Sequence, residues 1–176
     1  ISYDHEKIIS IEDYINTVIS KVGGMKILAE PGRSIVGNAG IFVTKVEYLK
    51  QNDIKSFAIV DGAMNDLIRP ALYNSYHDAV LIEEKTKGVT DSWDIVGPVC
   101  ETSDFLAKDR ELTLEKGDYI AILSAGAYGF VLSSNYNSRP RVPEVMVSEK
   151  SHSLVRQRET IESLFENEAI FEDEVN

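Results

Sequence analysis

The sequence predicts a mainly β chain with an α/β start, in which the end of an α/β domain is followed by an antiparallel β-barrel or sandwich domain. Two observations predict this class. Within residues 10–30, an amphipathic helical pattern is followed at once by a short apolar segment. After residue 40, short β-like segments recur between turn residues, and no long helix separates them.

The first unit is a helix followed by a strand. Ser10 is a suitable N-cap with Asp13 at the capping-box position, and Gly23 and Gly24 end the helix. Residues 25–29 are mostly apolar, which indicates a buried strand. Because a parallel strand needs neighbours on both sides, this unit is predicted to belong to a larger sheet or barrel. The apolar face of the helix consists of Ile11, Tyr14, Ile15, Val18, Ile19 and Val22.

The second region contains six β-like segments separated by turn residues. Many short strands of this kind predict an antiparallel barrel or sandwich. The chain after residue 150 is polar and acidic, with a short helix predicted at 159–168. The six segments are residues 41–49, 56–60, 79–83, 92–100, 119–124 and 142–147.

The composition excludes several classes of protein. The 176 residues include 18 Lys and Arg and 29 Asp and Glu, so the formal net charge is −11. Such a chain lacks the basic face of a nucleic-acid binder, and no stretch approaches the roughly 18 apolar residues of a membrane span. One Cys excludes a thiolate-cluster zinc site, and the three His have no metal-binding spacing. We therefore expect no nucleic acid, membrane or metal partner.

The first residue is Ile, and no signal-peptide pattern follows it. We therefore expect the chain to be a piece of a longer protein that continues upstream.

A candidate ligand-binding turn follows the predicted strand at residues 25–29. It reads Glu30-Pro31-Gly32-Arg33. Ligands of α/β sheets and barrels bind at the carboxyl ends of strands. Gly32 allows a ligand close to the backbone, and Arg33 offers a planar fork for phosphate or carboxylate. The alternative is an ordinary strand-to-helix turn with a surface arginine.

The only cysteine, Cys100, lies next to Glu101 in a segment that begins with Gly97 and Pro98. A negative neighbour favours the protonated thiol, so this thiol suits a proton donor better than a nucleophile. The alternative is a free cysteine packed as a small apolar residue.

Two further segments place tyrosines near other candidate residues. Arg69 and Tyr73 are four residues apart and share a face if the segment is helical, although Pro70 favours a loop or a short turn. Tyr128 follows three small residues after a predicted strand, which allows a phenol to crowd a ligand. The alternatives are a surface loop and a tight turn with a buried tyrosine.

Four segments, taken in order, resemble the motifs of one enzyme family, the diaminopimelate decarboxylases. These are pyridoxal 5'-phosphate enzymes of lysine biosynthesis with the alanine racemase-like fold (fold type III). The resemblance covers about residues 25–150. The segments are EPGRSIV at 30–36, DGAMNDLIRPALY at 61–73, GPVCETSDFLA at 97–107 and GAYGF at 126–130.

The resemblance implies the domain organisation. Residues 1–40 are expected to be the C-terminal end of the pyridoxal-phosphate-binding (β/α)8 barrel. Residues 41–160 are expected to form the C-terminal β domain, and residues 161–176 an acidic tail. The Schiff-base lysine of the family lies on the first barrel strand, and no Lys of this chain lies in a matching motif. We therefore expect this chain alone to be inactive.

The resemblance also implies which residues hold the cofactor. Glu30, Pro31, Gly32 and Arg33 are expected to hold the phosphate of pyridoxal phosphate, with Arg33 also reaching the substrate. Tyr128 is expected to contact both cofactor and substrate.

The implied reaction converts meso-2,6-diaminopimelate to L-lysine and carbon dioxide. Arg69 and Tyr73 are expected to grip the distal end of the substrate. Glu101 is expected to bind the distal amino group, and Cys100 to donate the proton to the decarboxylated carbon. In this family the last two residues serve an active site shared with a second subunit, which implies a homodimer. The biosynthetic role and the composition imply a cytoplasmic protein.

Other readings stay open at this point. Ornithine and arginine decarboxylases of the same fold typically carry Asp where Glu101 stands, and their substrates have no distal carboxylate for Arg69. These two residues therefore favour diaminopimelate. Carboxynorspermidine decarboxylase, a non-catalytic relative and a plain structural module are the remaining alternatives.

Overall fold

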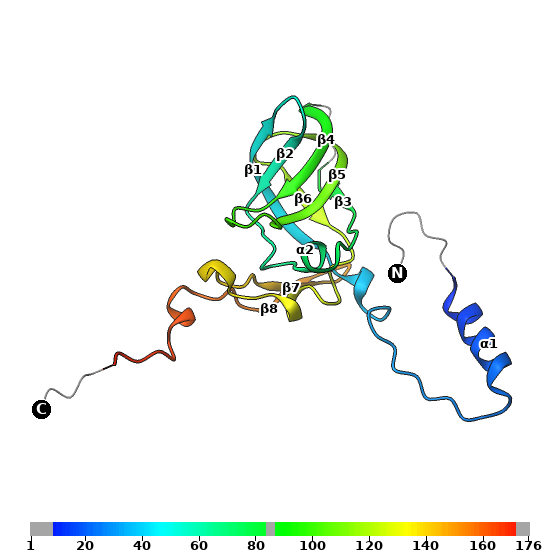
Figure 1. Cartoon of the computed structure of the whole chain (residues 1–176). Helices are drawn as coiled ribbons and strands as arrows, with labels where there is room; N and C mark the ends of the chain where they lie inside the picture. Colours follow the sequence, from blue (N-terminus) through cyan, green and yellow to red (C-terminus); the bar gives the residue numbers. More distant parts are fainter. Residues whose placement is uncertain (1–8, 84–86, 172–176) are drawn as a thin grey trace, which may run out of the picture.

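The main sheet has six strands in the order β3-β6-β1-β2-β4-β5 (Figure 1). The structure is a computed structural model, and it describes residues 9–83 and 87–171. The end strands β3 and β5 lie close together, so the sheet is nearly closed into a barrel. This confirms the mainly β class. The strands are β1 (Phe42–Gln51), β2 (Ser56–Val60), β3 (Ala79–Leu81), β4 (Val89–Val96), β5 (Phe105–Leu114) and β6 (Tyr119–Ile122).

The sheet is not wholly antiparallel, which corrects the prediction. β1 pairs antiparallel with β2 and with β6. β6 also pairs antiparallel with β3, and β4 pairs antiparallel with β5. In contrast, β2 and β4 run parallel. Parallel neighbours need a long crossover. Here the crossover contains the short helix α2 (Arg69–Tyr73) and the strand β3, which lies at one end of the sheet order.

Alternating side chains of the strands fill the interior of the barrel. β2 alternates buried and half-buried residues, as expected for a strand with one face on a core. Trp93 is fully buried, and its indole Nε1 donates a hydrogen bond to the Leu112 carbonyl at 3.0 Å. The largest fully buried apolar side chains around it are Val46, Val60, Leu67, Ile95, Leu106, Leu114, Ile120 and Ile122.

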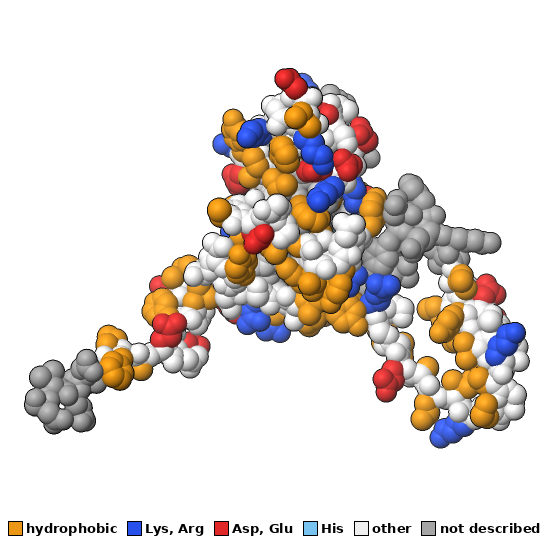
Figure 2. Space-filling model, in the orientation of Figure 1, with side chains coloured by type: hydrophobic (Ala, Val, Ile, Leu, Met, Phe, Trp, Pro, Cys, Tyr) orange, Lys and Arg blue, Asp and Glu red, His pale blue; other side chains and the backbone are white. Residues whose placement is uncertain are grey.

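The predicted N-terminal helix is present as α1 (Ile11–Val22). The Ser10 hydroxyl accepts the Asp13 N–H at 2.9 Å, and Gly23 ends the helix in the left-handed conformation at φ 57°. None of its residues is buried, and Figure 2 shows hydrophobic side chains along the exposed helix. α1 stands apart from the sheet (Figure 1).

The predicted buried strand at residues 25–29 is wrong for this structure. The segment forms no strand, and its residues are exposed. The physical reason is that a parallel strand exists only when neighbouring strands satisfy its backbone groups, and no described strand lies beside this one.

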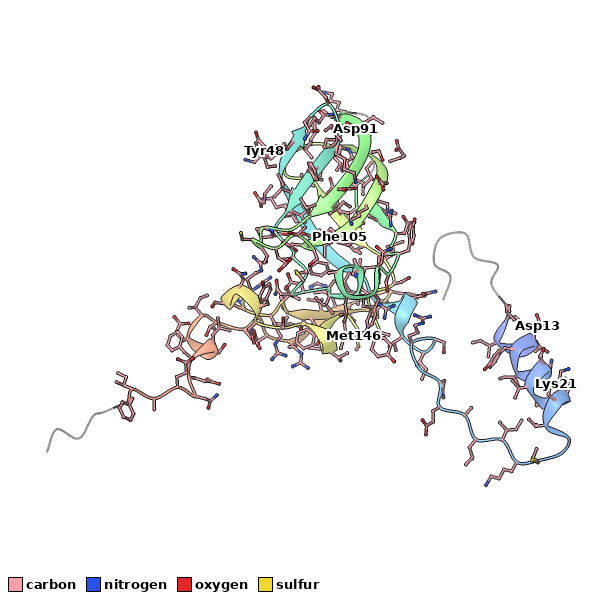
Figure 3. The ribbon with its side chains drawn as sticks, viewed as in Figure 1. Asp13, Lys21, Tyr48, Asp91, Phe105 and Met146 are labelled. Atoms are coloured by element: carbon pink, nitrogen blue, oxygen red, sulfur yellow. The ribbon has the colours of Figure 1, made fainter. Side chains whose placement is uncertain are left out.

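The C-terminal region differs from expectation in two ways. The segment predicted at 142–147 is β7 (Glu144–Val147), and it pairs antiparallel with β8 (His152–Arg156), which the sequence pattern did not predict. This hairpin is largely exposed, and Met146 of β7 is 66% exposed (Figure 3). The helix expected at 159–168 is only a 3₁₀ turn, η4 (Glu162–Leu164). The last five residues of the predicted acidic tail, 172–176, lie outside the described residues.

Three further 3₁₀ turns occupy the connections near the base of the barrel. They are η1 (Gly37–Ala39), η2 (Phe130–Leu132) and η3 (Tyr136–Ser138). Among the described residues, no helix has the length and apolar character needed to cross a membrane.

Candidate functional site

A buried arginine between two tyrosines forms the first part of the site, which we call the arginine–tyrosine group (Gly32, Arg69, Tyr73 and Tyr128). Arg69 opens α2 and is only 7% exposed. Its guanidinium carbon lies 5.9 Å from the ring centre of Tyr73 and 5.8 Å from that of Tyr128. Both distances are within the range of cation–π attraction. The structure thus brings together three of the residues that the sequence singled out.

Arg69 and Tyr73 share a face because the segment is a short helix, where a loop or a short turn was expected. Pro70 occupies the first turn of α2, where the missing N–H of proline costs no intrahelical hydrogen bond. The helix ends at Asn74 in the left-handed conformation, and the Asn74 N–H bonds to the Arg69 carbonyl. A five-residue helix is therefore enough to place the arginine and the phenol four residues apart on one side.

The charge of Arg69 has no carboxylate partner among the described residues. Its Nη2 donates to the Ser75 hydroxyl at 3.3 Å, and its buried Nε has no hydrogen-bond partner there. A buried guanidinium with an unused N–H is costly unless a ligand completes it. Its fork matches a carboxylate or a phosphate.

Tyr128 is fixed by close backbone packing between two segments far apart in the sequence. A β carbon on Gly126 would lie 2.0 Å from the Val36 carbonyl oxygen, so only glycine fits. The Gly126 N–H donates to the Gly37 carbonyl at 3.0 Å, and the Ala125 N–H donates to the Gly40 carbonyl at 2.8 Å. Tyr128 itself has the left-handed conformation, at φ 61°. Such a conformation in a non-glycine residue is sustained by its surroundings.

The turn at residues 30–33 lies against the same tyrosine. A β carbon on Gly32 would stand 3.6 Å from the Tyr128 hydroxyl. The Arg33 carbonyl accepts the Gly37 N–H at 2.7 Å, which starts the turn leading into η1. Glu30, Pro31 and Arg33 are all exposed. Gly32 therefore joins the arginine–tyrosine group, while these three neighbours line open surface beside it.

Cys100 and Glu101 lie in a different loop, between β4 and β5. Cys100 is an exposed free thiol. One Glu101 carboxylate oxygen lies 3.4 Å from the Ser103 N–H nitrogen, and the other lies 3.5 Å from the Tyr136 hydroxyl. These contacts are long, so the carboxylate is accessible to a cationic ligand. The predicted strand at 92–100 ends at Val96, and the two candidate residues are loop residues as expected for a site.

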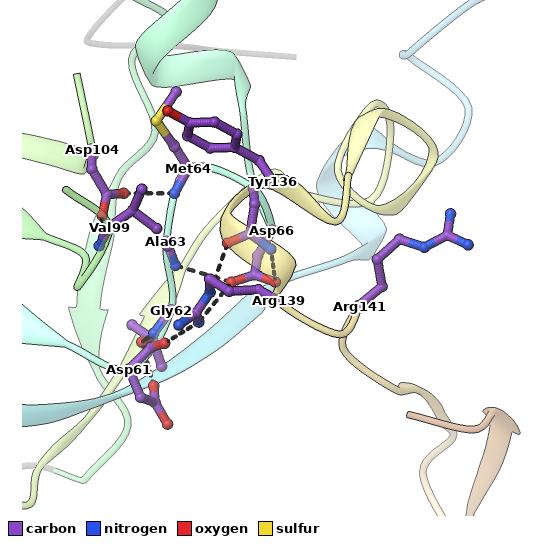
Figure 4. A network of polar contacts seen from close by, with 12 residues as sticks. Asp61, Gly62, Ala63, Met64, Asp66, Val99, Asp104, Tyr136, Arg139 and Arg141 are labelled. Carbon is purple, nitrogen blue, oxygen red and sulfur yellow. Dashed lines mark hydrogen bonds and ion pairs between the residues drawn. The ribbon is translucent and has the colours of Figure 1, made fainter. Parts of the chain in front are cut away.

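Two buried carboxylates organise the loops around this second part, and the sequence analysis did not single them out (Figure 4). Asp104 accepts the Met64 and Val99 N–H groups, each at 2.7 Å. Asp66 accepts the Ala63 N–H at 3.0 Å. Burial raises the pKa of both carboxyls, and the backbone hydrogen bonds act in the opposite direction.

Arg139 completes the polar network of Figure 4. It donates from Nε to the Asn65 side-chain oxygen at 2.9 Å and from Nη2 to the Asp61 carbonyl at 2.6 Å. Its Nη2 also lies 3.6 Å from an Asp66 carboxylate oxygen. The sequence pattern indicates a role of these residues in the site only weakly, because Asp and Asn beside glycine also form ordinary turns.

The two parts of the site are connected through the loop of residues 61–66. The loop of residues 61–66 contacts the Cys100 segment through Asp104 and leads directly into α2, which carries Arg69. Among the described residues, no group of three or more His, Cys, Asp or Glu side chains is arranged to hold a metal ion.

Comparison with known proteins identifies the family. Residues 3–126 match the model of the pyridoxal-dependent decarboxylases, C-terminal sheet domain. The chain is 56% identical over 146 residues to a diaminopimelate decarboxylase of Vibrio cholerae, covering 83% of this chain and 35% of the relative. A diaminopimelate decarboxylase of Pseudomonas fluorescens is 51% identical over 172 residues, covering 97% of this chain and 41% of the relative.

Solved structures agree with these sequence relatives. The crystal structure of diaminopimelate decarboxylase from Helicobacter pylori complexed with L-lysine superposes with a TM-score of 0.86 at 42% identity. That match covers 95% of this chain and 42% of the solved chain. The chain thus spans less than half the length of these relatives. It belongs to the pyridoxal-dependent decarboxylases and contains the C-terminal sheet domain of that family.

Proposed function

We propose that the chain is the C-terminal part of a diaminopimelate decarboxylase, a carboxy-lyase that converts meso-2,6-diaminopimelate to L-lysine and carbon dioxide. The observation that carries the proposal is the buried Arg69, which has no carboxylate partner in the described part of the chain. A substrate with a distal carboxylate supplies that partner, whereas ornithine and arginine have none. Relatives named diaminopimelate decarboxylase support the same substrate.

The residues present fit pyridoxal phosphate. A β carbon at Gly32 would be in ordinary van der Waals contact with the Tyr128 hydroxyl, at 3.6 Å, so the absence of a side chain here leaves the space beside the phenol to a bound group. In the proposed site the backbone and Arg33 hold the phosphate, Glu30 and Pro31 shape the turn, and Tyr128 contacts the cofactor. Bound pyridoxal phosphate supplies a ring that stores the electrons released as carbon dioxide leaves.

The remaining candidate residues act on the substrate. Arg69 and Tyr73 hold the distal carboxylate, and Glu101 holds the distal ammonium. Each charge-assisted contact contributes about 1.5–3 kcal/mol. The Cys100 thiol donates its proton to the carbon that has lost carbon dioxide. Its exposure supports a role toward a ligand that approaches from outside this loop.

The shared active site is part of the proposal. Among the described residues, no hydrogen bond or ring contact joins Cys100 or Glu101 to the side chains of the arginine–tyrosine group. This arrangement supports a homodimer in which the loop of one subunit completes the site of the other. We place the enzyme in the cytoplasm, where its biosynthetic role belongs.

The proposal also assigns the three regions of the chain. Residues 1–40 are the end of the (β/α)8 barrel, residues 41–160 are the β domain, and residues 161–176 are an acidic tail. The exposed apolar face of α1 supports the first assignment, because an amphipathic helix is stabilised by packing of that face. The Schiff-base lysine lies outside this chain, and the chain alone is inactive.

The test is carbon dioxide release by the complete parent polypeptide with added pyridoxal phosphate. Meso-diaminopimelate, ornithine and arginine are supplied in parallel, with a Cys100→Ala variant as control. We expect turnover of diaminopimelate alone, strongly reduced in the variant. Turnover of ornithine or arginine instead would show that Arg69 and Glu101 have other roles. No turnover of any of the three would favour a non-catalytic relative.

A further inference from the structure

We propose that Asp104 is a positioning residue that fixes the Cys100–Glu101 segment relative to the loop that leads to Arg69. The inference deepens the proposed function and rests on it for the role of Cys100. It is drawn from the contacts of one carboxylate, which joins two loops of the candidate site (Figure 4).

The carboxylate uses both oxygens on backbone groups of different loops. Oδ2 accepts the Val99 N–H at 2.7 Å, and Val99 directly precedes Cys100. Oδ1 accepts the Met64 N–H at 2.7 Å, in the loop of residues 61–66. Asp104 is only 5% exposed. Charge-assisted bonds of this length in a buried setting are among the strong ones, so the link between the loops is rigid.

The backbone of Asp104 closes the same segment. Its N–H donates to the Glu101 carbonyl at 3.1 Å, and its carbonyl accepts the Gly97 N–H at 3.1 Å. A β carbon on Gly97 would lie 2.4 Å from Asp104 Oδ2, so the carboxylate occupies space that only glycine leaves open. The turn that carries the thiol is therefore built around this side chain.

The other end of the link is itself anchored. Asp66 accepts the Ala63 N–H at 3.0 Å, and Arg139 donates to the Asp61 carbonyl at 2.6 Å and to the Asn65 side chain at 2.9 Å. The loop of residues 61–66 is therefore held at several points. Asp104 transmits this fixed position to the cysteine segment.

Placement of this kind matters for the proton donor. A displacement of about 1 Å in a reacting group lowers a rate by up to about 100-fold. Asparagine at position 104 keeps one acceptor and turns an NH2 group toward the other N–H. One loop then loses its hydrogen bond, and two donors face each other. The Cys100 segment is released, whereas Arg69, which binds the substrate, keeps its place in α2.

The test uses the full-length enzyme with Asp104→Asn, and Asp118→Asn as the matched control. Asp118 is also buried, and its carboxylate accepts a backbone N–H, from Glu115 at 2.8 Å, in the turn between β5 and β6. One readout is the rate of Cys100 alkylation by iodoacetamide, followed by mass spectrometry of its peptide across pH. A second is the separation of kcat from KM with diaminopimelate.

We expect Asp104→Asn to speed Cys100 alkylation by roughly threefold or more and to lower kcat by about tenfold or more, with KM within about twofold. Asp118→Asn should leave all three unchanged. Alkylation at the unmutated rate in folded Asp104→Asn would overturn the proposal, as would an equal change in both variants. Alkylation needs no turnover, so it tests Asp104 even if the enzyme proves inactive on diaminopimelate.

A measurement on the unmutated enzyme covers the case in which Asp104→Asn does not fold. Hydrogen exchange resolves the amides of Met64 and Val99, and both should exchange as slowly as amides inside β4 and β5. Fast exchange of the Val99 amide would show that Asp104 does not hold the segment, and would overturn the proposal.

Discussion

The packing of Gly126 against residues 36–40 predicts that Gly126→Ala weakens cofactor binding without touching a proposed cofactor ligand. A β carbon at this position would lie 2.0 Å from the Val36 carbonyl oxygen and 2.7 Å from the Gly40 nitrogen. Both atoms are backbone, so no side-chain rotation relieves the clash. The two segments must separate by at least about 1 Å, and the Gly32 turn then moves away from Tyr128.

The expected loss of stability follows from the two hydrogen bonds that this separation breaks. The two hydrogen bonds, Ala125 N–H to Gly40 and Gly126 N–H to Gly37, are each worth about 1 kcal/mol. The forced displacement adds about 1–3 kcal/mol. We therefore expect a loss of about 3–5 kcal/mol of local stability. Because binding requires the closed arrangement, the affinity for pyridoxal phosphate should fall by at least about 100-fold.

The assay is titration of the apo form of the full-length enzyme with pyridoxal phosphate, followed by absorbance, beside urea denaturation. Gly117→Ala is the control, because Gly117 has a restrictive backbone, at φ +95°, whereas a β carbon there meets nothing within 4 Å. The control should lose about 1 kcal/mol of stability and keep its cofactor affinity. Equal cofactor affinity in Gly126→Ala and the unmutated enzyme would refute the reasoning.

Three further predictions concern Arg69, the core and a half-buried ion pair. Arg69→Ala in the full-length enzyme should lower kcat/KM for diaminopimelate by about 10–150-fold, because one charge-assisted contact is lost. The measurement is a carbon dioxide release assay, and an unchanged kcat/KM would contradict the proposed carboxylate contact. Trp93→Phe leaves the Leu112 carbonyl without its donor and a gap in the core, and should cost about 2 kcal/mol or more of unfolding free energy by urea denaturation. The hydrogen bond from Arg141 lowers the pKa of Glu159 from 4.5 to about 2. The ionised Glu159 therefore stabilises the fold above pH 4.5, and this contribution is lost as the pH falls toward 2. The difference in unfolding free energy between the unmutated protein and Glu159→Gln should be about 1 kcal/mol at pH 6, reduced by solvent screening, and close to zero at pH 2; a constant difference would count against the ion pair.

Local signals in the sequence predicted the elements whose stability is local. Ser10 and Gly23 mark both ends of α1, and the structure uses both. The strand pattern at residues 56–60 predicted β2 with its bounds, because its alternation reflects one buried face. The Arg69 and Tyr128 motifs were singled out separately, but their proximity comes from the crossover and from glycine packing, neither of which periodicity reveals.

Elements that depend on distant partners were harder to predict. β5 (Phe105–Leu114) was missed, since charged residues such as Lys108, Asp109 and Arg110 interrupt its apolar pattern. The strand expected at residues 25–29 is absent for the opposite reason, because an apolar pattern without neighbouring strands does not form a sheet. The buried role of Asp104 has no local signal, as its two partners lie on loops from different parts of the chain.

The parallel pairing of β2 with β4 has a consequence for the order of folding. The crossover between these strands, residues 61–88, contains α2 and much of the candidate site. A loop of this length must close before the two strands can form their hydrogen bonds. The entropy cost of closing it therefore slows the step in which the barrel forms. We expect contacts within the crossover to form after that step, so that their loss accelerates unfolding more than it slows folding in stopped-flow measurements. We therefore expect the candidate site residues in this crossover to influence the rate at which the closed barrel unfolds.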